Sequence, residues 1–88
     1  MKANFKNLEV EISFGKFGNL DVTKLLGNHI HLLTNDIGLD DVAREIYYSE
    51  GEIDIDEHYA KEIVSLVRSN ECSMLAGIKK AIIKHLTE

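Results

Sequence analysis

Apolar and polar residues alternate strictly near the start of the chain. Residues 8–14 read LEVEISF, so that every second residue is apolar. This period of two is typical of a β-strand with one face on a core and the other in water. We therefore predict a strand over residues 8–14 with Leu8, Val10, Ile12 and Phe14 on its core face.

This strand needs a pairing partner, because a lone strand leaves its backbone groups without hydrogen bonds. Three partners are available: residues Phe17–Val22 through a turn at Gly15 and Lys16, the short segment Glu52–Ile55, or the same strand in a second subunit. The sequence leaves all three open.

Apolar residues recur at spacings of three and four over residues 22–33, 39–47, 59–67 and 75–86, which predicts amphipathic helices there. Asp21 offers an N-cap for the first, and Asp54 or Asp56 for the third. Gly51 is expected to close the second helix in the left-handed conformation. Gly27 lies within the first pattern. Either another backbone approaches closely there, or the helix ends at Leu26 and restarts after Asn28.

These elements predict a small α+β domain that is mainly helical, with an N-terminal β-strand or hairpin packed on three to four α-helices. Residues 1–88 contain no repeat or linker, so we expect a single compact domain. The residues expected at its core are Val42, Ile46, Ile63, Val67, Leu75, Ile78 and Ile82.

The charge of the chain is concentrated in one segment. Residues 36–57 contain nine acids and one base, or −8, and the rest of the chain carries +3, for a net charge of −5. Asp and Glu gather at helix N-termini and on solvated faces, which is the simpler interpretation. The more specific interpretation is an acidic surface that docks a basic-faced protein partner. The residues that we assign to that surface are Asp40, Asp41, Glu45, Tyr48 and Glu52.

The sequence also bears on the cellular compartment of the protein. No run of eighteen apolar residues could span a membrane, and the first residues, MKANFKNLEVE, lack the apolar stretch of a signal peptide. The one cysteine, Cys72, cannot form an internal disulfide, which agrees with a reducing compartment. We expect a cytoplasmic protein. A chain of 88 residues buries a modest core, so a homodimer stays open.

No pattern in the chain predicts a metal, a cofactor or catalysis. His29 and His31 would point about 200° apart on a helix and could not grip one ion. The run from Asp54 resembles the opening of a calcium loop, but Tyr59 stands where that loop needs Gly. The serines and threonines have no base at a readable spacing, and no Gly-rich phosphate loop is present. We therefore expect no metal, no cofactor and no enzymatic activity.

Nucleic-acid binding is the weaker alternative. The segment DDVAREI resembles the first helix of a helix-turn-helix, but the following connection is long, and the next helix opens with Asp56 and Glu57, which would repel phosphates. The leading hypothesis is a non-enzymatic protein-interaction or regulatory module with an acidic docking surface. The alternative is a small DNA-associated regulator of a bacterial mobile element, with the basic end of the last helix as its footprint.

Overall fold

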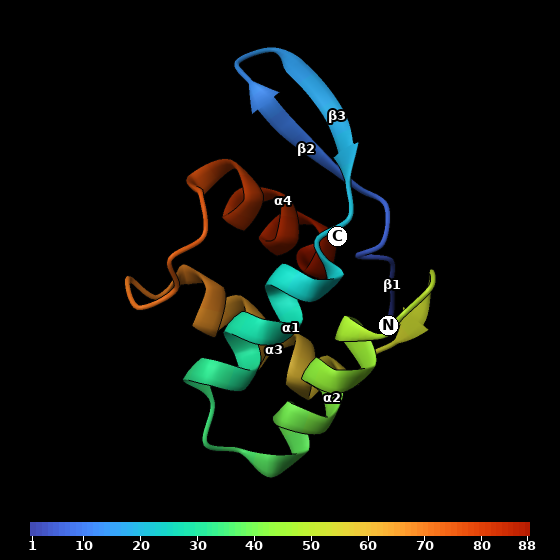
Figure 1. Ribbon diagram of the computed structural model, residues 1–88, viewed down its shortest axis with the longest axis vertical. Coiled ribbons are helices and arrows are strands. Elements are labelled where there is room, and N and C mark those ends of the chain that lie inside the picture. The colour runs from blue at the N-terminus through green and yellow to red at the C-terminus, as the bar shows by residue number, and fades with distance from the viewer.

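Four helices and two small antiparallel sheets make up the fold (Figure 1). The computed structural model describes residues 1–88. Its elements are β1 (Lys2–Ala3), β2 (Leu8–Ser13), β3 (Lys16–Leu20), α1 (Thr23–Leu33), α2 (Ile37–Tyr47), β4 (Ile53–Asp54), α3 (Glu57–Arg68) and α4 (Ala76–Thr87). The predicted class, a mainly helical α+β fold with an N-terminal hairpin, is confirmed.

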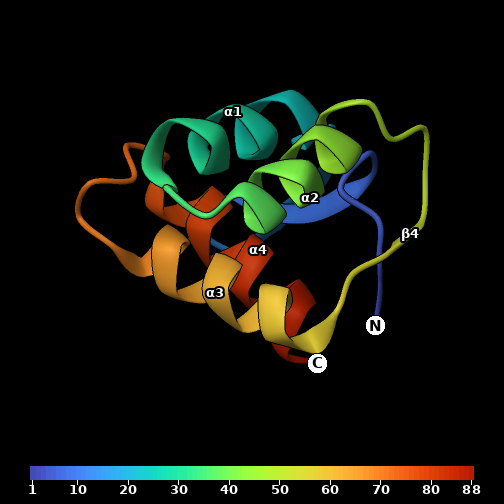
Figure 2. The same cartoon turned by 90° about the horizontal axis from the view of Figure 1, so that it is seen from below.

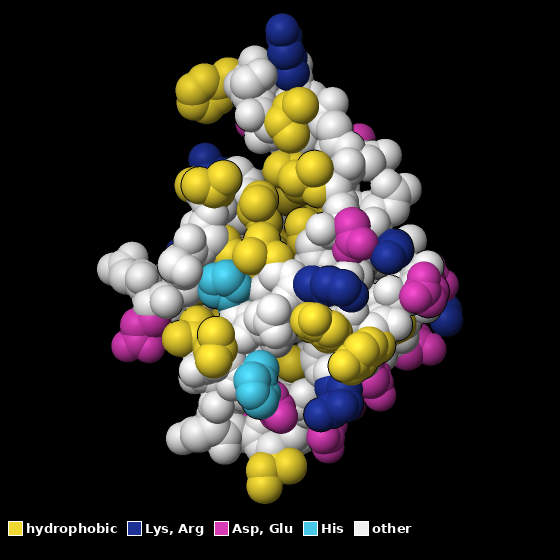
Figure 3. Space-filling view, in the orientation of Figure 1, with side chains coloured by type: hydrophobic (Ala, Val, Ile, Leu, Met, Phe, Trp, Pro, Cys, Tyr) yellow, Lys and Arg dark blue, Asp and Glu magenta, His cyan; other side chains and the backbone are white.

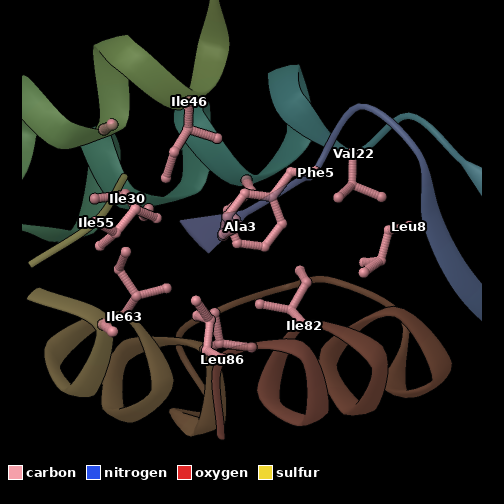
Figure 4. Close-up of a cluster of buried hydrophobic side chains, with 14 of the residues drawn as sticks. Ala3, Phe5, Leu8, Val22, Ile30, Ile46, Ile55, Ile63, Ile82 and Leu86 are labelled. Atoms are coloured by element: carbon pink, nitrogen blue, oxygen red, sulfur yellow. The ribbon is translucent and has the colours of Figure 1, made fainter. Parts of the chain in front are cut away.

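The helices form two layers with the core between them. Helix α1 packs on α2, α3 packs on α4, and Figure 2 shows the two pairs edge-on, one above the other. Phe5 lies in the middle of the buried cluster in Figure 4, with Ile30 and Ile46 from one layer and Ile63 and Ile82 from the other pointing toward it. All five side chains are fully buried. Burial of this apolar surface is the main force that holds the layers together.

The predicted core is confirmed except at Leu75. The other six predicted residues are buried or partly buried in the core cluster. Leu75 is 74% exposed, so that prediction was wrong. The reason is that α4 begins at Ala76, which leaves Leu75 as an N-cap residue with extended backbone outside the helical period.

The strand predicted near the start of the chain is β2, and its partner is β3. The antiparallel register places Leu8 opposite Leu20 and Val10 opposite Gly18, which confirms the first of the three pairings left open. Leu8 and Val10 are buried as predicted. Ile12 and Phe14 are exposed, contrary to the prediction, because the hairpin projects beyond the helices and the alternation continues past the end of the core (Figure 1).

The second candidate partner of β2 pairs elsewhere. Residues Ile53–Asp54 form β4, which runs antiparallel to β1 with Ala3 opposite Ile53. The Ile55 N–H donates to the Met1 carbonyl oxygen at 2.7 Å, and the Ile55 side chain is buried. This pairing fastens the acidic connection after α2 to the first residues of the chain.

Helix α1 continues through Gly27. A Cβ at this position would lie 2.9 Å from the Ala43 carbonyl oxygen and 2.9 Å from the Tyr47 Cβ. The close approach of α2 therefore explains the glycine, and the alternative of a helix that ends at Leu26 was wrong. Any larger residue at position 27 would push α1 and α2 apart.

Carboxylates begin the second and third long helices. Asp36 accepts hydrogen bonds from two backbone N–H groups at the start of α2, and Asp56, rather than Asp54, accepts one at the start of α3. Such caps satisfy N–H groups that have no partner within the helix.

Asp21 is the residue before the N-cap of α1, rather than the N-cap itself as predicted. The N-cap residue of α1 is Val22, and the Asp21 Oδ1 accepts from the N–H of Thr23 at 3.0 Å and from its hydroxyl at 2.6 Å. The Lys6 Nζ lies 3.1 Å from the Asp21 Oδ2. The Thr23 hydrogen bonds, together with Lys6, lower the pKa of Asp21 to about 2, and Asp21 in turn raises the pKa of Lys6.

Gly51 does not close α2. The helix ends at Tyr47 with Tyr48 as its cap, and Gly51 has no positive φ, so the predicted left-handed closure was wrong. The buried Ser49 hydroxyl instead donates to the Ile46 carbonyl oxygen at 2.7 Å. The Ile46 carbonyl oxygen also accepts the Ser49 N–H at 3.1 Å, so local hydrogen bonds close the helix end without a glycine in the left-handed conformation.

Candidate interaction surface on helix α2

Three of the five residues assigned to the acidic surface lie along one stripe of α2. Asp41, Glu45 and the cap residue Tyr48 are spaced by four and three, which places them on one helix face. Asp41 and Glu45 are exposed, and Tyr48 is 66% exposed. Asp40 lies on the neighbouring stripe, and Glu52 lies beyond α2 in the connection to β4. We call Asp41, Glu45 and Tyr48 the α2 stripe.

A shallow hollow of about 170 Å³ adjoins the α2 stripe, between α1 and α2. Its lining consists of Gly27, Asn28, His31, Asp40, Ala43, Arg44, Tyr47 and Tyr48. The hollow lies where Gly27 lets the two helices approach, so its shape depends on that contact. It brings two of the assigned residues, Asp40 and Tyr48, to one site.

A side-chain contact joins the two helices at the wall of the hollow. The His31 Nδ1 lies within hydrogen-bond distance of the Asp40 Oδ1. Figure 3 shows a His side chain beside an acidic one on this face of the molecule. Sequence reasoning considered His31 only as a metal ligand, because the fold that brings it to Asp40 could not be read from the spacing. Asp40 is therefore already partnered within the molecule.

The two tyrosines form an aromatic edge beside the hollow. Their ring centroids are 4.8 Å apart in an edge-to-face arrangement. The Lys24 Nζ lies 4.5 Å from the Tyr47 ring centroid and donates to the Tyr47 carbonyl oxygen at 3.5 Å. The chain thus holds one of its own ammonium groups over an aromatic face at this edge, as cation–π attraction favours. The ring of Tyr48 bears no such cation.

Internal partners account for five of the nine acids in residues 36–57. Two are helix caps and three pair with His31 or Lys2; these five are Asp36, Asp40, Glu52, Asp54 and Asp56. Four acids have no ion pair or hydrogen bond within the chain: Asp41, Glu45, Glu50 and Glu57. Internal partners therefore account for Glu52 and Asp40, whereas the two carboxylates of the α2 stripe face solvent, as the simpler interpretation also allows.

A serine–histidine contact was missed by sequence reasoning. The His29 Nε2 lies 3.1 Å from the Ser73 Oγ, and the His29 Nδ1 lies 2.8 Å from the Leu25 carbonyl oxygen. The carbonyl requires a proton on Nδ1, which leaves Nε2 to accept from the serine hydroxyl. The two residues are 44 positions apart, so no local spacing could have indicated the pair. No carboxylate contacts the ring.

The basic end of α4 is largely engaged within the molecule. The Lys79 Nζ donates to the Ser69 carbonyl oxygen at 3.1 Å, and the Lys84 Nζ lies 3.8 Å from the Glu88 Oε1. The His85 Nε2 accepts the Asn4 N–H at 2.9 Å. Lys80 is the one lysine of this group without an internal partner, and Lys84 is exposed despite its pair with Glu88.

None of the four helices is both long and apolar enough to cross a membrane. No three side chains of His, Cys, Asp or Glu come together as a metal-binding group. Comparisons with protein-family models, with curated proteins and with solved structures found no match to this chain.

Proposed function

We propose that this chain is a cytoplasmic, non-enzymatic interaction module whose α2 stripe docks a basic-faced protein partner. One observation carries the proposal: an exposed tyrosine shares a helix face with two carboxylates that have no partner in the molecule. Exposed tyrosines with a rigid apolar ring and a polar tip are favoured at protein interfaces.

The chemistry of the stripe suits a lysine or arginine side chain. A cation that approaches Tyr48 meets an aromatic ring and, one and two turns back along the helix, the carboxylates of Glu45 and Asp41. Lys24 over Tyr47 is an internal precedent for the same combination of ring face and oxygen acceptor. The adjoining hollow, about 170 Å³ in volume, would accept part of a side chain rather than a whole small molecule.

Asp40 and Glu52 take a supporting role in this proposal. Asp40 contacts His31 at the wall of the hollow, while Glu52 lies 3.9 Å from the Lys2 Nζ. Their intramolecular pairs are exposed and weak, about 0–1 kcal/mol each, so an approaching basic chain could exchange with them.

A labelled basic peptide of alternating lysine and alanine tests the proposal by fluorescence anisotropy. We expect the double variant Asp41→Lys/Glu45→Lys to weaken binding by roughly tenfold or more, since two exposed attractions become repulsions. The matched control is Glu71→Lys/Glu88→Lys, which changes the charge by the same amount away from α2, and should weaken binding by less than about twofold.

Substitutions of Tyr48 distinguish a docking surface from a general electrostatic effect. Tyr48→Ala should weaken binding of the same peptide, whereas Tyr48→Phe keeps the ring and should bind as the wild type does. Equal losses in the two double charge variants, with no effect of Tyr48→Ala, would show that the peptide responds to net charge alone and would refute the proposal.

A further inference from the structure

The outer half of the β2–β3 hairpin exposes apolar side chains that the core does not cover. Ile12 is 62% exposed, Phe14 is 98% exposed and Phe17 is 60% exposed. Leu20 and the α4 cap residue Leu75 are also exposed. Figure 3 shows hydrophobic side chains gathered over the projecting hairpin and the face below it. We call these five residues the hairpin patch.

The area of the hairpin patch lies at the upper end of what an ordinary monomer exposes. With ~180 Å² for each side chain, the exposed fractions amount to roughly 600 Å² of apolar surface. The largest apolar patch on an ordinary monomer is about 300–600 Å², and a standard interface buries about 800 Å² on each partner. The patch is smaller than a standard interface and is divided between the two faces of the hairpin, so its area suits a weak dimer.

The strand β3 has a free edge inside this patch. Helix α4 packs against β2, where a Cβ on Gly77 would lie 3.1 Å from the Glu11 carbonyl oxygen, whereas β3 has no comparable contact with any helix. No residue of β3 is buried. Edge strands are usually protected by proline or by several charges, and β3 has only Lys16 at its first position. Its outer N–H and C=O groups are open to another strand.

Apolar side chains flank this edge on both faces. Ile12 lies over Gly18, with its Cδ1 3.5 Å from the position of a Cβ there, while Phe17 pairs with Glu11 and so shares the opposite face. A lipid surface would cover one face and leave the backbone edge unpaired. An added strand pairs with the backbone edge, and its own side chains lie beside the apolar side chains on each face.

We infer that the occupant is a second copy of this chain, paired antiparallel through β3 to form a four-stranded sheet. The contact is self-complementary about a two-fold axis, so it closes at two copies. Residues 8–20 carry Glu9, Glu11 and Lys16, which gives the hairpin a net charge of −1. The hairpin lies at one end of the longest dimension of the molecule, which is 38 Å, and α2 lies toward the other end (Figure 1).

This separation keeps the acidic segments of two copies apart. Charges more than about 8 Å apart are largely screened at physiological salt, and the hairpin itself carries only −1, so net charge opposes hairpin-to-hairpin contact only weakly. A basic partner would be attracted to the acidic α2 rather than to the hairpin. An anionic membrane attracts clusters of basic residues, and the hairpin has only one lysine. The second copy is thus the occupant that charge and the open strand edge favour together.

Sedimentation velocity of the full chain from about 1 to about 200 µM tests the inference. We expect a monomer–dimer equilibrium in the wild type and at least a tenfold rise of the dimer dissociation constant in Ile12→Glu. Ile37→Glu is the matched control, because Ile37 is 82% exposed at the start of α2, and should dimerise as the wild type does. Thermal unfolding of each variant shows that it is folded.

Hydrogen exchange locates the contact. In the wild type, exchange of the β3 amides should slow as protein concentration rises, and in Ile12→Glu it should not. A wild-type monomer at every concentration, or equal dissociation constants for Ile12→Glu and Ile37→Glu, would overturn the inference. So would a monomer that floats with vesicles of phosphatidylcholine and phosphatidylglycerol, because lipid would then be the occupant. Peptide binding at the α2 stripe is measured separately, so either proposal can fail alone.

Discussion

Gly27→Ala tests the helix contact on which the candidate surface is built. The added Cβ would meet the Ala43 carbonyl oxygen and the Tyr47 Cβ, each at 2.9 Å. Alanine is favoured over glycine in a helix interior by about 1 kcal/mol, which by itself would stabilise α1. An extra methyl group in a packed contact costs about 1–3 kcal/mol, and a helix carbonyl cannot turn aside as a flexible side chain can.

The steric term should therefore win. Two contacts at 2.9 Å require the upper part of that cost, about 2–3 kcal/mol, so after the helix gain of about 1 kcal/mol we expect Gly27→Ala to lower the free energy of unfolding by about 1–2 kcal/mol. For a chain of this length that lowers the melting temperature by roughly 4–8 °C per kcal/mol. Urea unfolding followed by circular dichroism measures the first quantity, and a thermal scan measures the second.

Gly51→Ala is the matched control for this experiment. A Cβ at position 51 meets nothing within 4 Å, and the backbone there has no positive φ. The control should be neutral or slightly stabilising, since alanine restricts the unfolded chain. A Gly27→Ala variant as stable as the wild type would mean that α1 and α2 do not approach each other at Gly27 as described.

Three further predictions concern stability and chemistry. Ile82→Ala, at a fully buried position, should cost about 2–5 kcal/mol in urea unfolding, while Ile37→Ala, at an exposed one, should change stability by less than about 0.5 kcal/mol. Because the folded pKa of Asp21, about 2, lies below its ordinary value of 3.8, its stabilising contribution is complete above about pH 4 and is lost as pH falls toward 2. Asp21→Asn should therefore melt below the wild type at neutral pH, and thermal scans from pH 6 downward should show the two converge; a constant gap would contradict this assignment. Finally, Ser73 should not react with a fluorophosphonate probe, because no carboxylate orients His29 and no anion-stabilising site is evident beside them; labelling that Ser73→Ala abolishes would contradict a non-enzymatic role.

The fold could be predicted wherever a periodic pattern coincided with the extent of the core. The helical period identified Ile46, Ile63 and Ile82 as buried residues. It failed at the ends of elements, because periodicity does not show where a core stops. Ile12 continues the strand alternation into solvent, and Leu75 continues the spacing of α4 before that helix has begun.

Pairings between distant segments could not be predicted. The β1–β4 sheet joins two strands of two residues each, too short to carry a pattern. The close contact at Gly27 was one of two alternatives, and only the position of α2 decided between them.

The candidate surface was predicted in part. Charge and an exposed aromatic indicated Asp41, Glu45 and Tyr48, which the fold places on one stripe of α2. The internal partners of the remaining acids depend on tertiary contacts. His31 reaches Asp40 only because α1 and α2 pack side by side, and Lys2 reaches Glu52 only through the β1–β4 pairing.

Residue-level mapping of a bound cation tests the central claim most directly. Amide chemical shifts of the labelled protein would be followed by NMR during titration with the lysine–alanine peptide, at about 0.15 M salt to screen non-specific attraction. We expect the perturbed amides to cluster on the second half of α2, around Glu45 and Tyr48, and on the facing turn of α1 at Asn28. Shifts spread evenly over the acids at both ends of the molecule, or none at all, would contradict the assignment of the α2 stripe as a docking surface.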